Sequence, residues 1–191
     1  MSNPAPESLS TALQGDEEAF ATLVEFYQTP VFNLCYRMLG DAQEAEDAAQ
    51  ETFWRAYQAL KRYDSARPFI TWLLSIAAHY CIDQQRKRHL PMVDLEILPE
   101  ETIPNAAPNP ERTVNQREQE SLLRGLLKHL KPQDRAAVIM RYWYDFSEME
   151  IAEALSLSVS AVKSRLHRAR LLLAKQWKNL QPNPVLKEEA A

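Results

Sequence analysis

The chain has 191 residues, with 22 Lys and Arg against 26 Asp and Glu, a formal net charge of −4 and 46% hydrophobic residues. This length fits one domain or two small ones, and the composition excludes wholesale disorder. Apolar runs stay below the roughly 18 residues that a membrane helix needs. The N-terminus has no basic start followed by an apolar segment, so we expect neither membrane insertion nor a signal peptide.

Glycine and cysteine usage narrow the class further. Three glycines in 191 residues fall far below the usual ~7%, and neither GxGxxG nor GxxxxGK[ST] occurs. Sheets and phosphate-binding loops need glycine at their turns, so we predict an all-α fold. Cys35 and Cys81 lie inside apolar helical patterns, and we therefore expect no disulfide framework, metal site or cofactor, and a cytoplasmic location.

Helix start and stop signals recur along residues 16–90. Acidic residues follow Asp16 in what would be a first turn, Pro30 and Pro68 suit first helical positions, and Gly40 suits the position just past a helix end. We expect residues 1–15 to form a flexible N-terminus. The signals predict four helices, divided at Pro30, over roughly residues 16–29, 30–39, 41–61 and 68–89.

Residues 91–115 differ in composition from both flanks, with five prolines and five acidic residues. We interpret them as an extended linker between two domains, with a taut reach of up to roughly 85 Å. A compact C-terminal domain follows over residues 116–178, and residues 179–191 are expected to form a flexible tail. Its four predicted helices cover roughly residues 116–130, 132–142, 147–155 and 159–177.

The last two predicted helices carry a helix-turn-helix signature. Ser147 and Glu150 match a capping box that opens the shorter helix, residues 156–158 form the turn, and Ser158 is a suitable N-cap for the longer helix. Residues 121–181 hold 11 basic and 5 acidic residues, whereas the rest of the chain is acidic. This asymmetry indicates a nucleic-acid contact, with a solvated basic face as the alternative.

Two faces are expected on the last helix. One stripe should be buried; it consists of Val159, Val162, Leu166, Ala169 and Leu173. The other positions suit a major groove, because Lys, Arg and Ser donate to guanine acceptors or to phosphates. The residues predicted to contact DNA are Ser160, Ala161, Lys163, Ser164, Arg165, His167 and Arg168. His167 could instead be an ordinary surface histidine.

Three stretches resemble one protein family. EIAEAL, followed by SVSAVKSRLHRAR at residues 158–170, resembles region 4 of sigma-70 family sigma factors, within their extracytoplasmic-function (ECF) group. DAQEAEDAAQETFWRAY at residues 41–57 resembles region 2.2, and FITWLLSIA at residues 69–77 resembles regions 2.3–2.4. The resemblance covers about residues 15–90 and 118–178. It implies a transcription initiation factor without catalytic activity, in which region 4 reads the −35 promoter element.

The resemblance also assigns roles to residues 16–90. Glu44, Asp47 and Glu51 share one helix face, and such a cluster of like charges hints at a basic partner, which the resemblance identifies as the β′ clamp helices of RNA polymerase. The alternative is a solvated acidic face. The expected polymerase-binding residues are Glu44, Asp47, Gln50, Glu51 and Arg55. Region 4 is expected to meet the β flap.

Capture of the melted −10 strand is expected around the loop before the fourth helix. Stacking a base on an aromatic ring is worth roughly 1–3 kcal/mol. The alternatives are that Phe69 and Trp72 are simply core and that the basic run at 86–88 favours a helix C-terminus. The expected −10 residues are Tyr63, Arg67, Phe69, Trp72, His79, Arg86 and Lys87.

The sequence departs from the family pattern at four places. His79 and Ser75 stand where the family usually has Asn and Arg, and residues 63–65 replace a Phe-Arg-Gly loop start; all three bear on −10 preference. Ser156 stands at the usual glycine of the helix-turn-helix turn. Promoter DNA, core polymerase and an anti-sigma factor are the expected partners. The alternatives are a stand-alone helix-turn-helix regulator and an enzyme, for which no nucleophile–base pair is visible.

Overall fold

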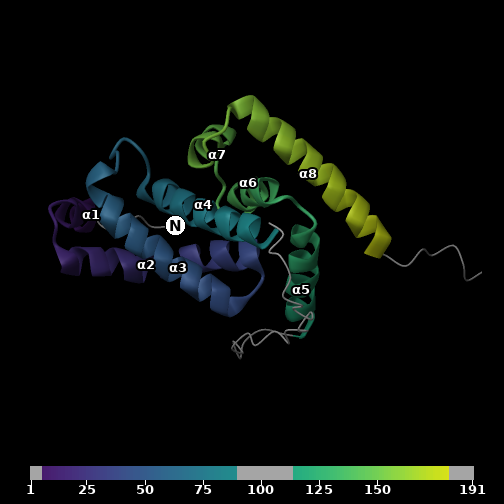
Figure 1. Ribbon diagram of the computed structural model, residues 1–191, viewed down its shortest axis with the longest axis horizontal. Coiled ribbons are helices and arrows are strands. Elements are labelled where there is room, and N and C mark those ends of the chain that lie inside the picture. Colours follow the sequence, from purple (N-terminus) through teal and green to yellow (C-terminus); the bar gives the residue numbers. More distant parts are fainter. Residues whose placement is uncertain (1–5, 90–113, 181–191) are drawn as a thin grey trace, which may run out of the picture.

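The computed structural model describes residues 6–89 and 114–180, and every regular element within those ranges is a helix, as Figure 1 shows. The predicted all-α fold is confirmed. None of the described helices is long and apolar enough to cross a bilayer. Most of the predicted linker and tail lies outside the described residues. The elements are α1 (Pro6–Leu13), α2 (Glu17–Leu39), α3 (Ala42–Ala59), the 3₁₀ turn η1 (Leu60–Arg62), α4 (Phe69–His89), α5 (Val114–Lys128), α6 (Pro132–Trp143), α7 (Glu148–Ala154) and α8 (Val159–Leu180).

Helix α1 corrects the expectation that residues 1–15 are flexible. Leu9, Ala12 and Leu13 follow helical spacing and pack on the core beside α2, with Ala12 only 2% exposed. Three apolar residues make a weak sequence signal, and a helix this short depends on packing rather than on propensity. Gly15, at φ +98°, turns the chain from α1 into α2.

Helix α2 continues unbroken through Pro30, so the predicted division into two helices is wrong. It begins at Asp16, whose carboxylate accepts a hydrogen bond from the Ala19 amide at 2.8 Å, and ends at Gly40, at φ +84°. A proline inside a helix costs about 3 kcal/mol. Burial on both sides of Pro30 outweighs that cost. The buried residues of α2 are Phe20, Leu23, Tyr27, Val31, Leu34, Cys35, Met38 and Leu39.

Helices α2, α3 and α4 pack against one another as a three-helix unit. Asp41 caps α3 by accepting from the Glu44 amide at 2.9 Å, as its sequence pattern predicts. The buried side of α3 carries small residues, including Ala45, Ala48 and Ala56, which let the neighbouring helices approach closely. The last predicted turn of this helix is the 3₁₀ segment η1.

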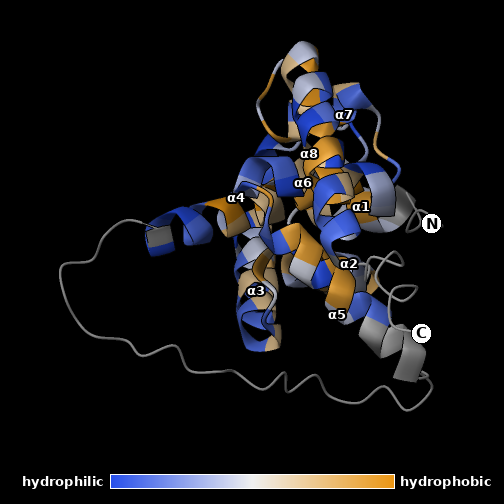
Figure 2. Ribbon diagram, turned by 90° about the vertical axis from the view of Figure 1, so that its right-hand side faces the viewer, coloured by the Kyte–Doolittle hydropathy of each residue, from blue (hydrophilic) through white to orange (hydrophobic). Residues whose placement is uncertain are grey.

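The C-terminal half, α5 to α8, lies directly against the N-terminal half. Helices α6 and α7 contact α2 and α4, and one cluster of buried apolar side chains runs through both halves. Helix α6 is almost entirely buried over residues 134–140 because it lies between α8 and the N-terminal helices. Figure 2 shows apolar colour concentrated where the helices meet, while the end of α4 is hydrophilic.

Candidate nucleic-acid and polymerase interface

Helices α7 and α8 form the predicted helix-turn-helix. The Ser147 amide donates to the Glu150 carboxylate at 2.8 Å, and the Glu150 amide donates to Ser147 Oγ at 3.2 Å, which confirms the capping box. Ser158 Oγ accepts from the Ala161 amide at 3.2 Å and so caps α8. These caps fix where α7 begins and where α8 leaves the turn.

The turn is made without glycine. Ser156 has φ +54°, in the left-handed region, and the next amide, that of Leu157, donates to the Ala152 carbonyl at 2.7 Å. A left-handed backbone costs a non-glycine residue roughly 1–2 kcal/mol. The capping bonds and the burial of Leu155 on the same segment hold the turn in place.

Helix α8 presents two faces, largely as predicted. Val162, Leu166 and Ala169 are buried, and Leu173 packs partly against the core. Val159 is 39% exposed, which corrects its place in the buried stripe, because α8 has only begun there and no helix covers it. Ala161 is half-buried. The exposed face carries Ser160, Lys163, Ser164, His167 and Arg168.

Arg165 differs from the other predicted DNA contacts because it is engaged within the domain. Its guanidinium lies 2.6 Å from the Asp134 carboxylate and 2.7 Å from the Gln133 side-chain oxygen, both on α6. The side chains of the pair are only 22% and 12% exposed. Arg165 therefore fastens α8 to α6. Lys163 makes a looser ion pair with Glu148 at 3.6 Å and stays exposed.

The aromatic residues predicted for strand capture form a cluster at the start of α4. The ring centroids of Tyr63, Phe69 and Trp72 lie 5.1–5.5 Å apart. Phe69 is 4% exposed and also packs on Tyr27, so its ring is not accessible to a base and instead supports the other two. Tyr63 and Trp72 are half-buried and keep part of their rings at the surface.

Burial affects the hydroxyls of this cluster. It raises the pKa of Tyr27 to about 12, with Tyr63 adding to the effect. The pKa of Tyr63 is raised in the same way, first by burial and then by Asp64. Both phenols therefore stay neutral in the physiological range. The Tyr63 hydroxyl donates to the Arg67 carbonyl and closes the loop before α4.

His79 lies on the exposed side of α4. Its Nδ1 is 2.8 Å from the Ser75 carbonyl oxygen. Because a carbonyl can only accept, Nδ1 carries the proton, and the neutral ring offers Nε2 as a hydrogen-bond acceptor. The Ser75 hydroxyl donates to the Trp72 carbonyl at 2.6 Å. Both residues that depart from the family pattern are thus folded into the same helical turn.

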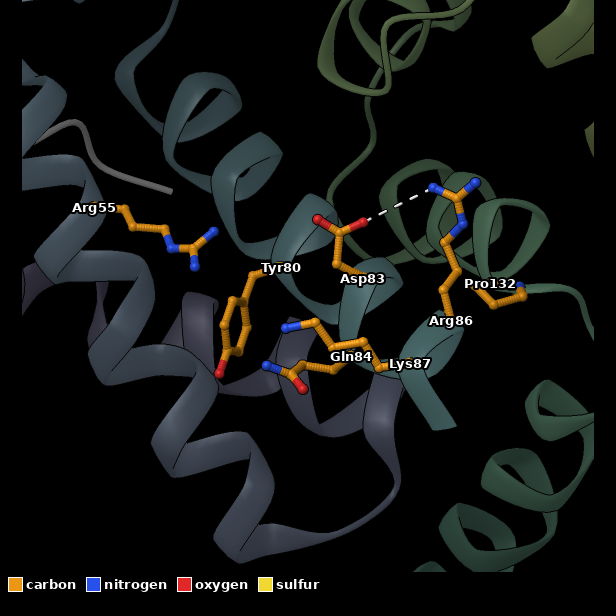
Figure 3. A pocket seen from close by; sticks show the side chains of 7 residues that line it. All are labelled: Arg55, Tyr80, Asp83, Gln84, Arg86, Lys87 and Pro132. Carbon is orange, nitrogen blue, oxygen red and sulfur yellow. Dashed lines mark ion pairs between the residues drawn. The ribbon is translucent and has the colours of Figure 1, made fainter. Parts of the chain in front are cut away.

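A basic pocket of about 620 Å³ lies between α3, α4 and the start of α6, as Figure 3 shows. Arg55 lies over the Tyr80 ring at 4.9 Å, and the Lys87 side chain points toward the same ring. Arg86 turns the other way and pairs with Asp83 at 3.9 Å. Tyr80 is therefore separate from the aromatic cluster at Tyr63. The lining residues are Arg55, Tyr80, Asp83, Gln84, Arg86, Lys87 and Pro132.

The acidic face predicted on α3 is largely neutralised from within the chain. Glu44 pairs with Arg88 of α4, and this hydrogen bond raises the pKa of Arg88. Glu51 pairs with Arg55 one turn later, with 2.7 Å between Arg55 Nε and Glu51 Oε1. The inference that a cluster of like charges awaits an external basic partner is therefore corrected for these two carboxylates.

Asp47 and Gln50 remain on the exposed side of α3. Asp47 accepts from the Gln43 amide at 3.4 Å and makes no ion pair with any residue in the described ranges. Gln50 lines a groove of about 370 Å³ between α2 and α3, together with Phe32, Phe53 and other residues. Our sequence reasoning missed this groove. Phe53, next to Gln50 in the candidate face, was the available signal.

The two cysteines are free and buried in the core of the N-terminal half. A hydrogen bond from the Cys35 side chain, together with burial, raises the pKa of Cys81, so both thiols behave as small apolar core residues. Within the described ranges, no group of three His, Cys, Asp or Glu side chains is placed to hold a metal ion.

Comparison with known proteins defines the class first. Models of Sigma-70 region 2 and of Sigma-70 region 4 match residues 23–90 and 120–173. The chain is 36% identical over 174 residues to the ECF RNA polymerase sigma factor SigW of Bacillus subtilis, covering 87% of this chain and 93% of that protein. It is 33% identical over 176 residues to the RNA polymerase sigma-H factor of Pseudomonas aeruginosa, covering 88% and 90%.

Two solved structures share the fold. CnrH, in complex with the cytosolic domain of CnrY, matches with a TM-score of 0.68 at 24% identity, over 91% of this chain and 97% of that chain. The sigma factor RpoE of Bartonella quintana, in complex with the anti-sigma factor NepR, matches with a TM-score of 0.61 at 19% identity, over 85% and 98%. The chain therefore belongs to the sigma-70 family of RNA polymerase sigma factors, and within it to the ECF group.

Proposed function

We propose that this sigma factor binds core RNA polymerase and directs promoter-specific transcription initiation, with residues 116–178 reading the −35 element and residues 16–90 docking polymerase and capturing the melted −10 strand. The exposed basic face of α8, which a capped helix-turn-helix presents to solvent, is the observation that carries this proposal. It has the residue types that bind base edges and phosphates in a major groove.

For the −35 duplex, we assign direct contacts to the exposed residues of α8. Arg168 and Lys163 are suited to guanine acceptors or phosphates, and Ser160, Ser164 and His167 to shorter contacts near the start of the helix. Arg165 acts by positioning α8 against α6. Ala161 is suited to apolar contact where the helix enters the groove.

For the −10 strand, we assign base stacking to Tyr63 and Trp72, with Phe69 as their support. His79 Nε2 can accept a hydrogen bond from a base or a bridging water where the family uses an amide. Arg86 and Lys87 lie beyond it on α4 and are suited to phosphates. Arg67 begins the same surface and carries the remaining positive charge near the cluster.

For polymerase, we assign the contact to Asp47, Gln50 and the groove beside them, facing the β′ clamp, with region 4 facing the β flap. Glu44, Glu51 and Arg55 shape this surface through their internal ion pairs. The related CnrH and RpoE chains are bound by partner proteins, the latter by an anti-sigma factor, and we expect such an antagonist here. We also infer that the chain has no catalytic activity and works in the cytoplasm, where its polymerase works.

Run-off transcription tests the proposal. Core polymerase lacking any other sigma factor is mixed with the purified chain and a pool of promoter fragments. We expect discrete start sites that depend on the chain, and their absence would reject the proposal. A pull-down with core polymerase separates the alternative, because a stand-alone helix-turn-helix regulator would bind DNA without binding β′.

A further inference from the structure

The two DNA-reading halves are joined by polar contacts as well as by apolar packing. The Tyr144 hydroxyl, on the residue after α6, donates to the Pro30 carbonyl of α2 at 2.6 Å. Burial raises the pKa of Tyr144, so the phenol keeps the proton that it donates. Arg37 of α2 lies over the Trp143 ring at 5.2 Å, and Arg124 of α5 lies over the Tyr36 ring at 5.1 Å.

Arg135 of α6 is the buried centre of this junction. Its guanidinium donates to three carbonyls at the end of α5, those of Leu127, Lys128 and Leu130, and also to the Met38 carbonyl at the end of α2. Gln85 of α4 donates to the same Met38 carbonyl. The last carbonyls of a helix lack partners within it, so Arg135 satisfies the ends of two helices that belong to different halves.

One contact reaches the −10 surface itself. Arg67 Nη2 lies 2.7 Å from the Glu153 carboxylate of α7, and Arg67 also faces Asp64 at 3.7 Å. Helix α7 immediately precedes the α8 face assigned to the −35 duplex, and it packs against α4. A carboxylate of the −35 domain therefore occupies a cation of the −10 surface.

This closeness conflicts with the layout of a promoter. Elements named −10 and −35 lie about 25 base pairs apart, which is roughly 85 Å along a duplex that rises ~3.4 Å per base pair. The Arg67–Glu153 pair brings the two readers into direct contact. The halves must therefore separate by tens of ångströms before both elements can be read.

We infer that the free chain is held in a closed, self-inhibited state by the α2–α4 to α6–α7 junction, with Glu153 occupying Arg67 in place of DNA phosphate. The inhibitory part of this inference rests on the proposed function. Polymerase and promoter must displace these contacts, so weakening them favours the open chain without altering any DNA-contacting side chain.

The test uses two substitutions that remove junction contacts but leave both halves intact, Tyr144→Phe and Glu153→Gln, alone and combined. Glu18→Gln, an equal loss of charge on the exposed first turn of α2, is the matched control. Spin labels at Gln58→Cys on α3 and Lys178→Cys on α8 report the separation of the halves in the free chain. Cys35 and Cys81 are fully buried and do not take up label.

We expect each junction substitution to shift the closed-to-open equilibrium about two- to tenfold toward the open form, as for the loss of one hydrogen bond or one exposed ion pair. The label distances should then gain a longer component, and half-maximal run-off transcription should need about three- to tenfold less of the double variant. The control should change neither quantity. Circular dichroism checks that helix content is kept.

Unchanged label distances in the double variant overturn the inference, as does a free chain that is already open. Longer distances with an unchanged concentration requirement also overturn it, because closure would then not inhibit. Absence of run-off from the unaltered chain would instead reject the proposed function. The distance measurement needs neither polymerase nor DNA, so the two failures are distinguishable.

Discussion

The α3 and α8 surfaces make an instructive pair, because sequence patterning assigns each a charged face and a macromolecular partner. On α8, four of the five predicted Lys, Arg and His side chains or their immediate neighbours remain accessible, with Arg165 as the exception that binds α6. On α3, Glu44 and Glu51 are paired with arginines of the same chain, and Asp47 is left without an ion pair among the described residues.

The difference shows that a charge cluster predicts a partner only after internal partners are subtracted. Glu51 finds Arg55 one turn away, which the sequence alone could indicate. Glu44 finds Arg88, which lies 44 residues further along the chain. Helix α8, by contrast, is nearly free of acids, so its exposed cations have few internal competitors.

The largest effect should come from reversing the one unpaired acid. Asp47→Lys should weaken core polymerase binding at least about 30-fold, roughly 2 kcal/mol, because like charges at an interface are strongly unfavourable. Binding is measured by fluorescence anisotropy of the labelled chain with core polymerase. Glu18→Lys, the same reversal on α2, should bind nearly as well as the unaltered chain. Equal losses for both would place the docking surface elsewhere.

Removing an accessible cation of α8 tests the other surface. Arg168→Ala should weaken −35 binding by about 1–3 kcal/mol if the side chain reads a base, and the loss should depend on the base pair at one position. Band-shift titrations of the polymerase complex on matched and altered −35 duplexes measure it. Arg170→Ala, an equal charge loss two residues later, should act uniformly on all sequences. A uniform loss for Arg168→Ala would reduce its role to phosphate contact.

Arg165 should behave as a structural residue instead. Arg165→Gln leaves the half-buried Asp134 without its partner and should lower the free energy of unfolding by about 1–3 kcal/mol. Urea denaturation followed by circular dichroism measures this change. Base preference at the −35 element should be kept. A variant of normal stability with altered base preference would return Arg165 to the DNA interface.

The smallest effect concerns the turn that aims α8. Ser156→Gly should stabilise the chain by about 0.5–1 kcal/mol, because relief of the left-handed strain exceeds the extra entropy of glycine in the unfolded chain. Ser158→Gly, two residues later, should instead lose a few tenths of a kcal/mol with its N-cap bond. Thermal melts compare the two. Destabilisation by Ser156→Gly would mean that the turn is not strained.

Local signals predicted most of the fold. The capping box at Ser147, the N-caps at Asp16 and Ser158 and the helix end at Gly40 depend on side chains within a few residues, and all are confirmed. The break at Pro30 was wrong because a local penalty lost to burial along the whole of α2. Helix α1 was missed because its stability comes from packing on α2.

Site residues were predicted less well where contacts are distant in sequence. Helical spacing cannot reveal that Arg165 faces Asp134, 31 residues earlier, or that Glu44 faces Arg88. Aromatic spacing likewise placed Phe69 among base-contacting residues, although Tyr27 of α2 covers it. The junction between the halves left no local signal, since Arg135 bonds to backbone carbonyls that every sequence possesses.

Gly40 joins two requirements that are usually separate. Its left-handed backbone ends α2, and a Cβ built on it would lie 3.0 Å from Cε of Lys128, on α5 of the other half. A methyl group there would strain the turn and also crowd a neighbour some 90 residues away in the chain. In a saturation library scored for growth, position 40 should therefore accept substitutions only poorly, and second-site changes at Lys128 to a shorter side chain should relieve part of that intolerance.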